Sequence, residues 1–161
     1  MTNKENFAQA ADTVSRDERL KTTLRRRFGV PLNRIPERDY IRFLSTVYVD
    51  ESKEGAMFLA LCAYAKYGAS KRHLPEAIGK ALQNSRYEEH LRKDISVMLR
   101  SSRQVAMIKI PVIMKTLKDA DLSADMADFY NDLLVWDVQT RKKWAREIAR
   151  ASQNKGGKKN D

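Results

Sequence analysis

The segment EEHLRKDISVMLRS, residues 88–101, decides the fold class. Its apolar side chains Leu91, Ile95, Met98 and Leu99 recur every three or four residues. At about 100° per residue this spacing places them in one stripe along a helix. Charged residues occupy the other side. The pattern predicts an amphipathic α-helix whose stripe packs against further helices of the same chain.

The flanking segments show related patterns, so we expect an all-α protein. Residues 37–48 should form a helix that buries Ile41, Leu44 and Tyr48, which are spaced i, i+3, i+7. Pro111 should kink or interrupt a helix over residues 104–118. No segment shows the sustained two-residue alternation of a strand, and 6 Gly and 4 Pro are too few for an all-β chain.

The length of 161 residues allows one domain or two small ones. We expect two packed helical bundles, residues 1–70 and 71–151, followed by a basic disordered tail over residues 152–161. The polar residues 1–6 should be frayed. One cysteine, Cys62, cannot form an internal disulfide, and the chain has neither a signal-like N-terminus nor an apolar run of about 18 residues. We therefore expect a cytoplasmic protein with no membrane contact.

Charge indicates the class of partner. Lys and Arg number 31 against 21 Asp and Glu, a net charge of +10, which points to an anionic partner. On the helix over residues 88–101, extended back to Arg86, the cations Arg86, Lys93 and Arg100 lie opposite the apolar stripe, with Arg103 near the edge of that face. Cations two turns apart, about 10 Å, can follow a phosphodiester backbone. A solvated outer face is the alternative interpretation.

Two further basic clusters lie elsewhere in the chain. Arg25, Arg26 and Arg27 close a predicted helix, and because successive residues point about 100° apart they cannot all face the core. Cations at a helix C-terminus also stabilise the helix dipole, which is the purely structural alternative. The other cluster follows Thr140 and consists of Arg141, Lys142, Lys143, Arg146 and Arg150, around the apolar pair Trp144 and Ile148.

Acidic residues are segregated from the basic ones. Six aspartates and no Lys or Arg lie between Asp119 and Asp137. On the helix predicted over residues 124–136, Asp125, Asp128 and Asp132 should form an outer face, either solvated or docked against a basic protein. Their spacing does not resemble a calcium loop, so we expect no metal.

Catalytic motifs are missing from the sequence. There is no P-loop, no GxGxxG and no GxSxG. His73, His90 and Cys62 lack the spacing of a zinc site, and Cys62 lies in an apolar helix typical of a buried, inert thiol. We expect a protein that is not an enzyme and needs no cofactor.

Five short motifs together resemble the CasB family, the small subunit of the type I-E CRISPR interference complex, Cascade. Residues 23–31, TLRRRFGVP, are similar to the family's LRR-x-x-G-x-P opening. Residues 56–61, AMFLAL, resemble its Ala/Leu-rich helix, and residues 78–82, IGKAL, its LGRAL element. Residues 99–103, LRSSR, resemble an L-R-A-D-R element, and LLVW at 133–136 with the basic stretch after it resembles the closing helix. The motifs occur in the family's order from about residue 20 to 150.

The resemblance implies a non-enzymatic protein of two small helical bundles that binds nucleic acid within Cascade. In that family two copies lie head to tail along the guide-RNA complex, support the target DNA and contact the backbone-forming and large subunits. Matching positions imply phosphate contacts, and geometry adds three more. The residues that the resemblance implies are Arg25, Arg26, Lys80, Arg100, Arg103, Arg141 and Lys142; those added from helix geometry are Arg86, Lys93 and Arg146.

Two other functions remain open at this point. A free-standing helical DNA-binding regulator would need base-reading side chains on a recognition helix, and few exposed Asn or Gln stand at such positions. A protein–protein adaptor could instead bind the basic face of one copy to the acidic face of another. Assembly that resists salt in the absence of nucleic acid would favour the adaptor.

Overall fold

The computed structural model describes residues 1–83 and 88–159, with side chains to residue 153 except that of Glu88. Within these ranges the protein is all-α, as the sequence predicts, and its one β-bridge pairs Ala69 with Ala124. No described helix is both long enough and apolar enough to span a membrane. The helices are α1 (Asn3–Ser15), α2 (Glu18–Arg26), α3 (Glu37–Thr46), α4 (Glu54–Tyr67), α5 (Leu74–Leu82), α6 (Glu88–Leu99), α7 (Arg103–Thr116), α8 (Met126–Val135) and α9 (Val138–Lys159), with single turns of 3₁₀-helix at Leu32–Arg34 and Glu51–Lys53.

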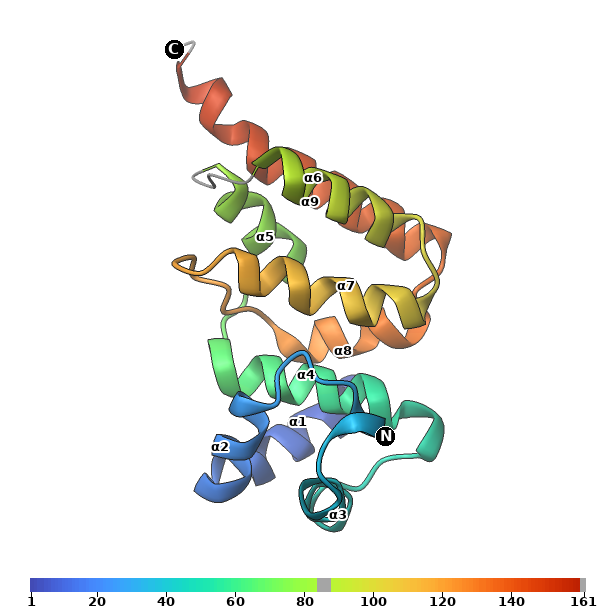
Figure 1. The fold of residues 1–161 in the computed structure, drawn as a ribbon. Helices are drawn as coiled ribbons and strands as arrows, with labels where there is room; N and C mark the ends of the chain where they lie inside the picture. Colours follow the sequence, from blue (N-terminus) through green and yellow to red (C-terminus); the bar gives the residue numbers. More distant parts are fainter. Residues whose placement is uncertain (84–87, 160–161) are drawn as a thin grey trace.

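Helix α4 forms the centre of the N-terminal half. Its sequence is apolar on nearly all sides, and nine of its residues are buried, which is typical of a helix that other elements surround. It packs against α2, α1 and α8. Figure 1 shows α1 to α4 in the lower part of the molecule and α8 between α4 and α7.

Helices α5 and α9 form the most extensive contact of the C-terminal half. The contact is close because Gly79 of α5 has no side chain: a Cβ atom there would lie 2.6 Å from the carbonyl oxygen of Ile148 and 2.7 Å from the Cβ of Ala151. Trp144 of α9 is fully buried and packs edge-on against Trp136, with ring centroids 5.3 Å apart. The glycine therefore sets how near α9 can come to α5.

Helix α6 packs against α7 through the stripe that the sequence predicts. Leu91, Ile95 and Met98 are buried, and Leu99 is half-buried. Pro111 lies inside α7 and is buried, but the helix continues through it from Arg103 to Thr116. The expected interruption is absent. A proline removes one backbone hydrogen bond, and the buried packing of Ile110, Ile113 and Met114 on either side compensates for that loss.

Helix α8 joins the two halves. It belongs to the predicted C-terminal bundle but packs against α1 and α4 of the predicted N-terminal one. The loop before α5 runs beside the loop before α8, where the Ser70 N–H donates to the Ala124 carbonyl at 3.1 Å and the Asp125 N–H to the Arg72 carbonyl at 2.7 Å. Residues on both sides of position 70 belong to one hydrophobic core. The division of the chain into two bundles at this position stays a prediction.

Three sequence-based expectations about single helices are wrong. Residues 3–6 are the first turn of α1, which buries Phe7 and Val14, so they are not frayed. Helix α3 buries Phe43 and is followed by the buried Val47, whereas Tyr48 is 91% exposed and Ile41 54%. The Phe43 ring packs edge-on against Phe58 at 5.2 Å, and this contact turns the opposite side of α3 outward. Helix α9 runs to Lys159, beyond the end expected at Ala151.

The α5–α9 contact can be tested with Gly79→Ala. The added methyl group has no free space, and overpacking of this kind costs about 1–3 kcal/mol of stability. We expect Gly79→Ala to lower Tm by several degrees in thermal unfolding followed by circular dichroism. The matched control is Gly55→Ala on α4, whose Cβ would meet only the end of the flexible Met107 side chain at 3.3 Å. Equal Tm values for the two variants would show that α9 can shift away without cost.

Candidate nucleic-acid interface

Arg100 and Arg103 lie at the turn between α6 and α7. Because α6 ends at Leu99, Arg103 begins α7 and does not extend the α6 face as the sequence suggested. Both side chains are exposed; the Arg100 Nε donates to the Ser96 carbonyl at 3.2 Å. The indole N–H of Trp136 donates to the Ser101 carbonyl at 3.2 Å. This bond holds the turn against the α8–α9 turn, so the start of α9 lies near the two arginines.

The start of α9 supplies the next predicted cations. Lys142 and Arg146 are exposed, and Arg141 is half-buried with its Nε donating to the Asp137 carbonyl at 3.4 Å. Lys143 points inward instead and pairs with Asp132 at 3.7 Å. Asp137 caps this helix by accepting from the Thr140 N–H at 2.8 Å. The structure thus places Arg141 and Lys142 at the same end of the C-terminal half as Arg100 and Arg103.

The remaining predicted cations lie farther apart. Lys80 on α5 and Lys93 on α6 are exposed, and neither forms an ion pair with a side chain that the structure describes. Arg86 falls outside the described residues. On α2, Arg25 and Arg26 are exposed, and the Arg25 Nε donates to the Ala65 carbonyl at 3.2 Å. Figure 1 shows α2 in the other half of the molecule from α5, α6 and α9, so the predicted set does not form one patch.

The fold gathers into two grooves several cations that were not among the predicted site residues. One groove, of about 360 Å³, lies between the start of α5 and α9 and includes Lys71, Arg72 and Arg150 beside His73, Glu76 and Glu147. The other lies between α2 and α3 and adds Arg19, Arg38 and Arg42 to Arg26. The run Lys71–Arg72–His73 in a loop was a usable signal for the first groove. Nothing in the sequence pattern brings α2 and α3 together.

The aspartates of α8 are not the outer face that the sequence predicted. Asp125 is the N-cap of α8, accepting from the Asp128 N–H at 3.1 Å. Asp128 and Asp132 are only 8% and 6% exposed. The reason is that α8 is covered on two sides, by the apolar core and by α1 and α9. Docking through this face loses its support, because the carboxylates already have partners within the chain.

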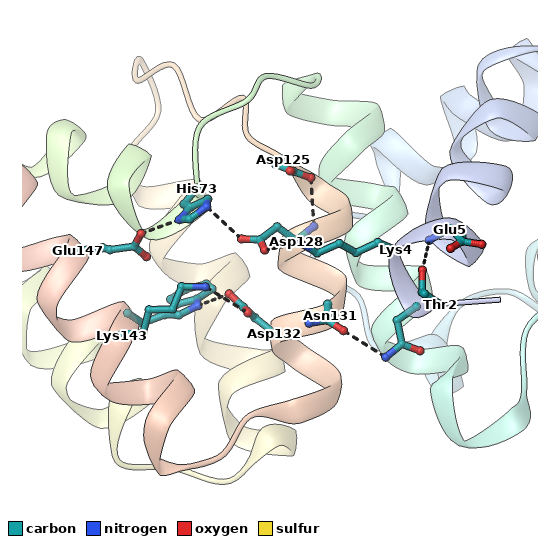
Figure 2. Close-up of polar contacts among 12 residues, drawn as sticks. Thr2, Lys4, Glu5, His73, Asp125, Asp128, Asn131, Asp132, Lys143 and Glu147 are labelled. Carbon is teal, nitrogen blue, oxygen red and sulfur yellow. Dashed lines mark hydrogen bonds and ion pairs between the residues drawn. The ribbon is translucent and has the colours of Figure 1, made fainter.

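Figure 2 shows these partners. Asp128 pairs with Lys4 of α1 at 3.3 Å and lies 3.7 Å from the Nε2 of His73, whose Nδ1 is 2.6 Å from Glu147 of α9. Asp132 accepts from the Trp144 indole N–H at 2.8 Å. Burial raises the pKa of Asp132, against the lowering effect of this hydrogen bond. The contacts link α1, α8 and α9 and are structural.

Comparison of the sequence with models of protein families identifies the family. The model of the family described as CRISPR-associated protein Cse2 matches residues 20–150. The chain belongs to the Cse2 family. No curated protein and no solved structure matches it. The match confirms the resemblance predicted from the motifs, since Cse2 is CasB, the small subunit of type I-E Cascade.

Family membership gives the role in general terms. Cse2 proteins are non-catalytic structural subunits of Cascade in CRISPR interference, which assemble with other Cas subunits and the guide RNA. Within this Cse2 chain Cys62 is buried, and burial raises the pKa of its thiol, so the thiol is a poor nucleophile. Among the described side chains, no three His, Cys, Asp or Glu residues are grouped to hold a metal ion.

The buried carboxylate of this Cse2 chain can be tested with two variants. Asp132→Ala leaves the buried Trp144 indole N–H without an acceptor, which costs about 1–3 kcal/mol. Asp132→Asn keeps an acceptor oxygen and removes a charge that burial disfavours. We therefore expect the free energy of unfolding in urea to fall clearly for Asp132→Ala and much less for Asp132→Asn. If Asn is as damaging as Ala, the Lys143 ion pair matters more than the indole bond.

His73 makes stability depend on pH. Its hydrogen bond with Glu147 and the charges of Glu147 and Asp128 raise the pKa of His73, while burial and Lys143 lower it less. Because the folded protein favours the protonated ring, this stabilisation is present below about pH 6.5 and is lost as pH rises through the raised pKa. From pH 5.5 to 8.5, Tm should fall more for the native chain than for His73→Gln. The same change of Tm with pH in the native chain and in His73→Gln would exclude this linkage.

Proposed function

We propose that this Cse2 chain stabilises the R-loop between guide RNA and target DNA by contacting phosphates without reading sequence. The observation that carries the proposal is a set of exposed cations, in both halves of the molecule, that form no ion pair with the side chains that the structure describes. Arg26, Lys80, Lys93, Lys142 and Arg146 belong to this set.

Phosphate contacts suit a small subunit of this kind. Exchange of a DNA duplex for an RNA–DNA heteroduplex is nearly balanced in free energy, so modest contacts to the backbone can decide its direction. Lys and Arg bind phosphates of any sequence, and the affinity falls steeply with salt because counterions are released. The described cations lie on several helices, which favours contact along an extended strand over recognition at one point.

The proposed assembly follows the family. We propose that the chain contacts the backbone-forming and large subunits, that a second copy lies beside it, and that guide RNA and target DNA pass near its basic surfaces in the cytoplasm. Which of the two nucleic acids each cation contacts is a matter for cross-linking in the assembled complex. An acidic docking face on α8 is not part of this proposal.

The experiment is the double variant Arg100→Ala/Arg103→Ala, incorporated into Cascade. We expect R-loop stability to fall at least about tenfold, because even one charge-assisted contact of about 1.5 kcal/mol gives that factor. Folding should change little, since exposed substitutions usually cost under about 0.5 kcal/mol. R-loop dissociation is measured by filter binding, and Tm by thermal unfolding.

The matched control is Arg34→Ala/Lys118→Ala, which removes the same charge from two exposed residues outside the predicted set. An R-loop as stable as that of the native complex, or the same loss in the control, would contradict the assignment of Arg100 and Arg103. Loss of Tm in the first variant would mean that the arginines support the fold instead.

A further inference from the structure

The turn between α6 and α7 is joined to the end of α8 by two hydrogen bonds that run in opposite directions. The indole N–H of Trp136 donates to the Ser101 carbonyl at 3.2 Å, and the Nη1 of Arg103 donates to the Leu134 carbonyl at 3.5 Å. Leu134 lies in the last turn of α8, where backbone carbonyls have no partner within the helix. The two bonds therefore connect segments of the chain that are 35 and 31 residues apart in sequence.

Local hydrogen bonds order the ends of α6 and α7 but do not place the turn. The Arg100 N–H donates to the Val97 carbonyl at 3.2 Å and closes the end of α6. Ser102 caps α7, because its hydroxyl accepts from the Val105 N–H at 3.4 Å. Both bonds stay within the pair of helices, and α7 packs more extensively on α6 than on α8. The position of the turn relative to α8 and α9 thus depends on the bonds that cross to it.

Of these two bonds, the one from Trp136 is better suited to hold the turn in place. Trp136 is 7% exposed, and its ring packs edge-on against the fully buried Trp144. A hydrogen bond shielded from water is stronger than one in contact with it. Arg103 is exposed, and its bond to Leu134 is at the long limit for a hydrogen bond. The guanidinium can therefore turn toward a ligand while the indole stays where it is.

The turn presents two guanidinium groups to solvent. Arg100 and Arg103 are both exposed and are three residues apart. A guanidinium has five N–H donors, and the Arg100 Nε uses one of them on the Ser96 carbonyl at 3.2 Å. Each arginine therefore keeps donors for a phosphate oxygen. Two groups bind one ligand best when their backbone is already held in the bound geometry.

We propose that Trp136 is a positioning residue for the phosphate contacts of Arg100 and Arg103. Its N–H fixes the backbone of the turn from which both arginines project, so this backbone loses no further freedom when nucleic acid binds. The inference rests on the proposed function, which assigns phosphate contacts to the two arginines. It goes beyond that function by assigning an effect on the R-loop to a core residue that touches no phosphate.

The test removes the indole N–H and keeps the ring packing. Trp136→Phe retains an aromatic ring against Trp144, and benzothienylalanine at position 136 keeps the size of the indole with sulfur in place of the N–H. In assembled Cascade we expect either change to weaken the R-loop about threefold to tenfold, the factor that corresponds to one ordinary hydrogen bond. The slope of log affinity against log salt should also become less steep, because loosely held arginines neutralise phosphates less completely. A residue that acts through stability alone would leave that slope unchanged.

A double-mutant cycle assigns the effect to the arginines. In the Arg100→Ala/Arg103→Ala background, Trp136→Phe should cause no further loss of R-loop affinity, because no contact is left to position. An equal loss in both backgrounds would overturn the proposal.

The matched control is Phe43→Leu on α3, which loosens the core contact with Phe58 in the other half of the molecule (Figure 1). This control should lower Tm, because it shortens a fully buried side chain, and should leave R-loop affinity and its salt slope unchanged. If affinity falls with Tm to the same extent in Phe43→Leu and in Trp136→Phe, Trp136 acts through the fold and the proposal is wrong.

Amide hydrogen exchange of the isolated full chain tests the positioning without nucleic acid. In Trp136→Phe the amides of Arg100 and Ser101 should exchange faster than in the native chain, whereas those of α2, in the other half of the molecule, should not change. Unchanged exchange at the turn would overturn the proposal even if the R-loop were weaker.

Failure of the proposed function gives a different pattern of results. A normal R-loop in Arg100→Ala/Arg103→Ala would reject the phosphate contacts of the two arginines, and the role of Trp136 with them. A weakened R-loop in that variant beside a normal one in Trp136→Phe would reject the positioning role alone and retain the proposed function.

Discussion

Burial of two carboxylates on α8 is the constraint on which the arrangement of both halves depends. An unpaired buried charge costs several kcal/mol, so Asp128 and Asp132 must keep their partners. Those partners come from different parts of the chain: Lys4 from α1, His73 from the loop before α5, and Trp144 from α9. Each element that supplies a partner is thereby fixed relative to α8. Separation of the halves would break the Lys4–Asp128 pair and expose to water the apolar side chains that α8 buries against α1 and α4.

The helices themselves could be predicted wherever one side was apolar and the other polar. The prediction that α6 buries its apolar stripe is correct because the opposite side of this helix carries charges that must face water. Helix α3 has two candidate faces, Ile41 with Leu44 and Phe43 with Val47, and only the contact with Phe58 decides between them. The prediction that the aspartates of α8 face solvent is wrong for a related reason. An aspartate that is buried and paired has the same sequence pattern as one that is solvated.

The exposure of single cations was predictable because lysine and arginine are almost never fully buried without a partner. Their grouping was not. Arg26 and Arg42 are separated by a 3₁₀ turn and a proline-containing loop, and their shared groove depends on how α2 and α3 pack. The family motifs found Arg25 and Arg26 but not the wall opposite them. Periodicity describes one helix at a time, whereas a binding groove is a property of two.

Helix α1 lies before the first residue of the family match, yet it is part of the hydrophobic core. Phe7 and Val14 are 3% and 0% exposed, and Asn3 bonds to Asn131 of α8 at 3.2 Å. A boundary drawn at residue 20 would cut through this packing and leave the α8 surface bare. The hydrophobic core of this chain therefore extends beyond the residues that the family model matches. Similarity marks what a family has in common, and burial marks where a domain begins.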